Sequence, residues 1–173
     1  MLAKYFKKLN NNQRTIIFTT FVAEELGGFG SQYFSKQLLP AKVVAMFNIE
    51  MIGTESKWGK NSAYITGFEK SDMGKILQDN LKGSIFKFYA DPYPEQQLFY
   101  RSDNATLARL GVPAHTISTS KMDNEPNYHK ASDEIGTLDM VNMAEIIKAI
   151  AISSSSIING KSTPSRVDTT QLK

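Results

Sequence analysis

The stretch that decides the fold reads TIIFTTFVAEELGGFGS and runs from Thr15 to Ser31. Its first nine residues are apolar or β-branched, which predicts a β-strand over 15–23. This strand ends at two adjacent carboxylates, Glu24 and Glu25, and glycines then lead into a predicted helix over 28–38. Ligands of α/β proteins bind at the carboxyl ends of strands, so we expect the chemistry at this edge.

Two further segments bring polar groups to the ends of predicted strands. The strand predicted over 42–49 ends in Glu50, and a polar loop carrying Tyr128 and His129 follows the strand predicted over 114–118. Carboxylates and imidazole are donors that zinc accepts. Neighbouring side chains leaving a strand point in different directions, so one glutamate of a pair can bind a metal while the other acts as general base.

The hydrophobic pattern of the rest of the chain predicts helices and strands in alternation. Helices are predicted over 2–9, 71–82, 103–110 and 138–157, and strands over 62–66 and 85–89. This alternation predicts an α/β fold, a three-layer sandwich with a mostly parallel central sheet. The segment after Gly160 has no periodicity, so we expect one domain over 1–158 and a mobile tail over 159–173.

Four ordered motifs carry a family resemblance from about residue 1 to residue 158. They are Phe21–Gly27 with Gly30–Ser31, Asn48–Gly53, Arg101–Asn104 before Leu110–Ala114, and Tyr128–His129 four residues before Asp133. On these motifs the chain resembles the dizinc exopeptidases of zinc peptidase family 28, typified by bacterial leucyl aminopeptidases and related to glutamate carboxypeptidase II. The resemblance implies the zinc exopeptidase fold.

The resemblance also implies a role for each candidate residue. Glu24 takes the place of the general base, and Glu25 and His129 take the places of ligands to one zinc ion. Glu50 takes the place of a ligand to the second zinc, where most relatives have aspartate. Tyr128 takes the place of a tyrosine that hydrogen-bonds the developing oxyanion in some relatives.

The Arg101–Asn104 motif supplies weaker candidates. In the family, the residues matching Ser102, Asp103 and Asn104 lie beside the substrate pocket. Ser102 and Asp103 could also be a nucleophile and its orienting group, but no histidine matches a triad base, and Asp103 is expected to cap the following helix. His115 matches no ligand position and is interpreted as a core residue.

Two of the six main residues of the family site have no counterpart in this chain. They are an early histidine and the aspartate that bridges both metals, so the resemblance predicts an incomplete catalytic domain that lacks its N-terminal part. Such a chain is expected to bind one zinc ion or none. It would also have an uncovered sheet edge, which favours self-association. Whether it is a fragment or a natural remnant stays open.

Composition bounds the remaining classes. The chain has 173 residues, of which 41% are hydrophobic and 21% charged, enough for one domain with a sizeable core. A net charge of +3 is too small to indicate nucleic acid, and the absence of cysteine excludes disulfides and thiolate zinc sites. No apolar run approaches the roughly 20 residues of a membrane span. By analogy with exported relatives, we expect the parent protein to be periplasmic or secreted.

Three functions compete at this point. The first is a zinc-dependent aminopeptidase that removes N-terminal residues of peptides through a metal-activated water. The second is a glutaminyl cyclase, which shares the fold and uses one zinc ion; Glu50 and the context of Glu24 and Glu25 favour the peptidase. The third is a non-catalytic interaction domain of the same fold. The missing upstream ligands favour it, while Glu24, Glu25 and His129 argue against it.

Overall fold

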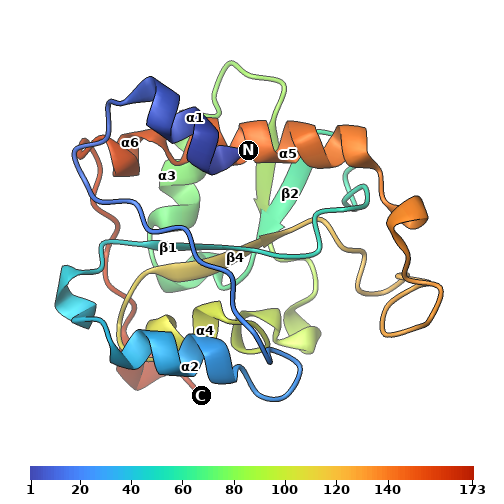
Figure 1. Ribbon diagram of the computed structural model, residues 1–173, viewed down its shortest axis with the longest axis horizontal. Helices are drawn as coiled ribbons and strands as arrows, with labels where there is room; N and C mark the ends of the chain where they lie inside the picture. Colours follow the sequence, from blue (N-terminus) through green and yellow to red (C-terminus); the bar gives the residue numbers. More distant parts are fainter.

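A computed structural model describes the whole chain from Met1 to Lys173. A four-stranded sheet lies between two layers of helices (Figure 1). The strands are β1 (Met46–Ile49), β2 (Ser62–Ile65), β3 (Lys87–Ala90) and β4 (Ala114–Ser118), in the order β1-β4-β2-β3. The outer pairs β1–β4 and β2–β3 are parallel and the central pair β4–β2 is antiparallel, so the mostly parallel sandwich is confirmed.

The helices divide between the two faces of the sheet. α1 (Leu2–Leu9), α3 (Met73–Asn80), α5 (Met140–Ser153) and α6 (Ser155–Ile158) cover one face, and α2 (Phe29–Lys36) and α4 (Asn104–Ala108) cover the other (Figure 1). Short 3-10 turns occur in the connections. None of the helices has the length and apolar character needed to cross a bilayer.

The core sits on both sides of the two central strands. Every residue of β2 and β4 is buried, including the polar residues Ser62, His115, Thr116 and Ser118, because helices cover both faces of these strands. Under α3 and α5, the completely buried side chains of Leu77, Ile117 and Ile146 form the centre of the larger cluster. A smaller cluster joins α4 to the opposite face of the sheet through Leu107 and Val112.

The strand predicted over 15–23 is wrong. This segment is an irregular connection between α1 and α2 (Figure 1), and residues 15–21 take part in no backbone–backbone hydrogen bond. Ile17 and Val22 are 58% and 74% exposed. β-branched composition favours an extended backbone, but a strand also requires a neighbouring strand to pair with, and this segment has none.

Most other boundaries shift by a few residues. α1 and β4 match their predicted ranges. The strand predicted over 42–49 begins only at Met46, because Pro40–Lys42 forms a 3-10 turn. The helix predicted over 138–157 is divided at Ser154 into α5 and α6.

The segment after Gly160 lies against the domain. The Arg166 guanidinium donates to the backbone carbonyls of Val43 and Pro40 at 2.8 and 3.1 Å, and the buried Val167 donates its amide to Gly111 O at 3.2 Å. The mobility expected for 159–173 remains a prediction. Such motion would break the hydrogen bonds of Arg166 and Val167.

Candidate active-site cleft

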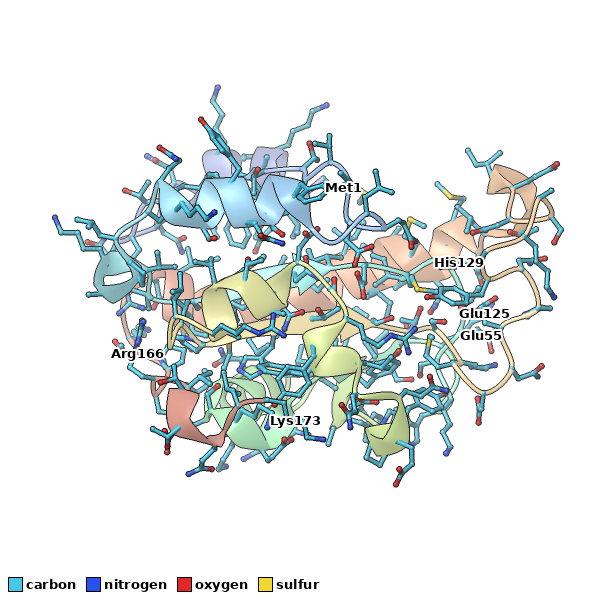
Figure 2. The ribbon with its side chains drawn as sticks, turned by 90° about the horizontal axis from the view of Figure 1, so that it is seen from below. Met1, Glu55, Glu125, His129, Arg166 and Lys173 are labelled. Atoms are coloured by element: carbon cyan, nitrogen blue, oxygen red, sulfur yellow. The ribbon has the colours of Figure 1, made fainter.

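All five residues assigned to chemistry or metal binding line one cleft. It has a volume of about 840 Å³ and lies between α2, α4 and the loops that follow β1 and β4. Its lining includes Glu24, Glu25, Glu50, Tyr128 and His129. Figure 2 shows His129 from the α2 and α4 side, at one end of the pair of helices. The tertiary fold therefore brings together residues that lie far apart in the sequence.

The closest contact among them joins Glu25 and His129. The imidazole Nε2 lies 2.9 Å from the Glu25 carboxylate oxygen Oε1, across 104 residues of sequence. The Tyr128 ring stacks on the imidazole with centroids 4.0 Å apart, and its hydroxyl accepts a long hydrogen bond of 3.5 Å from Arg101. Both Glu25 and His129 are more than half exposed, so the pair is open to a ligand from solvent.

The backbone is strained beside the candidate residues. Six non-glycine residues have positive φ, and three of them are candidate residues or their immediate neighbours: Ala23 (58°) precedes Glu24, Met51 (48°) follows Glu50, and His129 itself has 56°. A left-handed conformation costs an L-residue roughly 1–2 kcal/mol. Such strain concentrates at functional sites, where the surrounding structure holds it in place.

Glycines hold the two glutamates against the start of α2. Gly28 has φ of 70° and donates its amide to Ala23 O, and the Gly30 amide donates to Val22 O at 3.1 Å. A Cβ on Gly30 would lie only 2.7 Å from Val22 O. The glycine allows the turn carrying Glu24 and Glu25 to fold directly onto the helix.

Burial and neighbouring charge tune two of the carboxylates. Partial burial, followed by the charges of Glu25 and Asp103, raises the pKa of Glu24 above its ordinary value. Burial also raises the pKa of Glu50, and a hydrogen bond from Ser102 counteracts that rise. A raised pKa makes a carboxylate a better proton acceptor near neutral pH.

A partly buried network of hydrogen bonds fixes the Glu50 carboxylate. Ser102 Oγ donates to Glu50 Oε2, and Asn48 Nδ2 donates to Ser102 Oγ at 2.7 Å and to Thr116 Oγ1 at 2.9 Å. Thr116 in turn donates to Asn104 Oδ1 at 2.8 Å. Sequence reasoning missed Asn48, although an amide within an apolar strand was a signal for it.

The three weaker candidates divide. Ser102 lines the cleft. Asn104 is completely buried and lies outside the lining, where its amide donates to Phe99 O and Ala114 O. Asp103 occupies the N-cap position of α4, but its side chain makes no capping hydrogen bond and its buried Oδ1 has no partner, so the expected cap is wrong.

His115 is the core residue expected. Its ring is completely buried, with Nδ1 2.9 Å from Thr66 O and Nε2 2.6 Å from Ser71 Oγ. Burial lowers the pKa of His115, which keeps the ring neutral.

The donors fit zinc in kind but not in number. Glu25 offers a carboxylate oxygen and His129 an imidazole nitrogen, both ordinary zinc ligands. No group of three or more histidine or carboxylate side chains converges on one point. Catalytic zinc sites normally use three protein ligands, so the residues of this chain supply an incomplete set.

We compared the sequence and the fold with those of known proteins. The sequence profile described as peptidase family M28 matches residues 1–153, and no curated protein matches the sequence. The fold is similar to a zinc aminopeptidase from Bacillus subtilis, BSAP (TM-score 0.66, 16% identity, 89% of this chain and 36% of that one). It is also similar to the Legionella pneumophila aminopeptidase LapA (0.60, 20%, 80% and 38%) and to an aminopeptidase from Aneurinibacillus sp. strain AM-1 (0.59, 18%, 89% and 35%). The chain thus spans little more than a third of the length of these structures, and at such identities the similarity concerns the fold.

Proposed function

Because the chain belongs to peptidase family M28, we propose that its cleft is part of the active site of a zinc-dependent aminopeptidase that hydrolyses N-terminal residues of peptides. The observation that carries this proposal is the 2.9 Å contact between Glu25 and His129 in the cleft that Glu24 and Glu50 also line. A carboxylate and an imidazole held together in an open cleft are suited to share a metal ion.

The residues divide the work as follows. Glu25 and His129 would hold one zinc ion and Glu50 the other, and bound zinc would polarise the scissile carbonyl and lower the pKa of water. Glu24 accepts a proton from the attacking water and returns it to the leaving amine. Tyr128 donates a hydrogen bond from its phenolic hydroxyl to the developing oxyanion.

The cleft also suits an aminopeptidase electrostatically. A peptide with a free α-amine carries a positive charge, and three carboxylates, Glu24, Glu25 and Glu50, line one end of the cleft. One cation, Arg101, lies among them, so this end keeps an excess of negative charge. With two donors for one metal and one for the other, we expect the chain by itself to bind zinc weakly and to turn over little substrate.

Two other functions remain as alternatives. A non-catalytic interaction domain is favoured by one observation, namely that no three metal-binding side chains converge. A glutaminyl cyclase would use the same fold to cyclise an N-terminal glutamine with release of ammonia. With a Gln-Ala substrate, the peptidase releases free glutamine whereas the cyclase releases ammonia.

The test measures zinc affinity and hydrolysis of a leucyl anilide at added zinc. The variants Glu25→Gln and His129→Gln should each weaken zinc binding, whereas Glu24→Gln should bind zinc as the parent does. Any turnover should fall by at least about 10²–10⁴-fold in Glu24→Gln, because an amide cannot accept the proton. Glu134→Gln, an exposed site outside the cleft, is the matched control.

Several results would contradict the proposal. Unchanged zinc affinity in both Glu25→Gln and His129→Gln would remove the metal assignment. Normal turnover in Glu24→Gln would remove the base. Two tightly held zinc ions with rapid turnover would show that other residues complete the site, and absence of both binding and turnover would favour the interaction domain.

A further inference from the structure

The cleft extends away from the candidate catalytic residues as a groove between α2 and α4. Both helices lie on the same face of the sheet and run in the same direction, away from the loop that carries Glu24 and Glu25 (Figures 1 and 2). They begin side by side, since a Cβ on Gly28 would lie 3.7 Å from Asp103 Oδ1. The walls of the groove are mostly polar and come from both helices and the two residues that follow α4: Gln32, Ser35, Lys36, Thr106, Arg109 and Leu110.

Charge changes sign along this groove. Glu24, Glu25 and Glu50 line one end together with a single cation, Arg101, so that end is acidic on balance. At the other end, Lys36 lies in the last turn of α2 and Arg109 at the C-cap of α4. Neither cation forms a hydrogen bond or an ion pair within the chain; the Arg109 guanidinium lies 5.8 Å from the centre of the Tyr100 ring. The far end therefore presents two cations that lack an anionic partner.

The length of the groove sets the size of a ligand that spans both ends. At a rise of about 1.5 Å per residue, Arg109 lies roughly 9 Å along α4 from Asp103, and Lys36 roughly 12 Å along α2 from Gly28. An extended peptide covers about 3.3 Å per residue. A chain of three residues therefore covers roughly 10 Å, which reaches from the start of the two helices to Arg109, with Lys36 roughly 2 Å beyond.

We propose that this groove binds the third residue of a peptide through a carboxylate, so that tripeptides with a free C-terminus are the preferred substrates. The inference rests on the proposed function, because it places the peptide's amino terminus among the three glutamates. Arg109 provides the forked donors that match a carboxylate, and Lys36 adds a second charge. An acidic side chain on the third residue offers the same chemistry, and the test distinguishes the two sources.

The experiment measures dissociation constants by NMR titration of the whole chain with Leu-Gly-Gly, Leu-Gly-Gly-amide and Leu-Gly-Asp-amide. Leu-Gly-Gly should bind about tenfold more tightly than its amide, the effect of one charge-assisted contact. Recovery of affinity by Leu-Gly-Asp-amide would identify an acidic side chain as an equivalent source. The double variant Lys36→Gln/Arg109→Gln should abolish the difference between acid and amide.

The control is Lys7→Gln/Lys8→Gln on α1, which removes the same charge from two exposed lysines on the opposite face of the sheet. This control should still bind Leu-Gly-Gly more tightly than Leu-Gly-Gly-amide. Equal affinities for all three peptides, no binding of any of them, or an equal loss in the control would overturn the inference. If Lys36 and Arg109 only complement the dipoles of their helices, all three peptides should bind with equal affinity.

Acetyl-Leu-Gly-Gly separates this inference from the proposed function. If acetylation leaves affinity unchanged while acid and amide still differ, the carboxylate site stands and the amine site required by an aminopeptidase fails. If acetylation weakens binding but acid and amide bind equally, the aminopeptidase stands and the carboxylate site fails.

Discussion

Gly30→Ala tests whether the glycine motif exists to hold the two glutamates on α2. The new Cβ would lie 2.7 Å from Val22 O and 2.8 Å from Val22 N, distances that real Cβ atoms essentially never show. Because both contacts are backbone atoms, the turn must move, and overpacking of this kind costs about 1–3 kcal/mol. Alanine regains at most about 0.5–1 kcal/mol through its better helix propensity. The net loss of stability should be centred on about 1 kcal/mol and reach at most about 2.5 kcal/mol.

For a chain of this size, a loss of about 1 kcal/mol corresponds to a decrease in Tm of about 2–4 °C. Urea unfolding gives the free energy, and the NMR signal of the His129 ring reports whether Glu25 has moved away from it. Gly136→Ala is the matched control, since a Cβ there meets nothing within 4 Å and φ is not positive. A Gly30→Ala protein as stable as Gly136→Ala, with an unchanged His129 signal, would refute the reasoning.

Three further predictions concern strain, pH and the C-terminal segment. Ala23→Gly should raise the free energy of unfolding in urea by about 1 kcal/mol by relieving the left-handed backbone, whereas Ala41→Gly, where φ is not positive, should lower it; equal losses in both would contradict the strain. Burial raises the pKa of Glu50 in the folded chain above its ordinary value of 4.5. The protonated Glu50 side chain therefore contributes to stability fully below about pH 4.5, and this contribution is lost as pH rises through the pKa of the folded state. Glu50→Gln should therefore be more stable than the parent at about pH 7 but not at about pH 4, and identical pH profiles would exclude the effect. Arg166→Ala should speed hydrogen exchange at the Val167 amide, whose hydrogen bond Gly111 O accepts. If this amide already exchanges as fast in the parent as in an unfolded peptide, the result would instead support a mobile tail.

Local pattern was enough to predict most elements of this fold. Helix α1 and strand β4 begin and end at the predicted residues. The amphipathic period specifies α1, and β4 is a short segment that directly follows Pro113. The candidate donors Glu25, Glu50 and His129 could be named for a similar reason, since family motifs are local in sequence. Their proximity in one cleft was expected from strand ends. That premise holds for Glu50, which follows β1, but not for Glu25, because residues 15–23 form no strand.

Pairing is where sequence reasoning failed. Residues 15–23 have the composition of a strand, yet hydrogen bonds of a sheet are made between segments, and no segment of this chain pairs with them. The antiparallel pairing of β2 with β4 within an otherwise parallel sheet was likewise invisible, because side-chain periodicity is the same in both directions.

The sequence by itself determined the types of elements, the apolar core and the chemical nature of the candidate donors, since these depend on residue type and short-range spacing. Only the tertiary structure decided which groups meet. The 2.9 Å approach of His129 to Glu25 and the hydrogen bonds that join Asn48 to Ser102 depend on contacts between distant segments. So does the opposite charge at the two ends of the groove between α2 and α4, because it arises from the direction in which two separate helices pack.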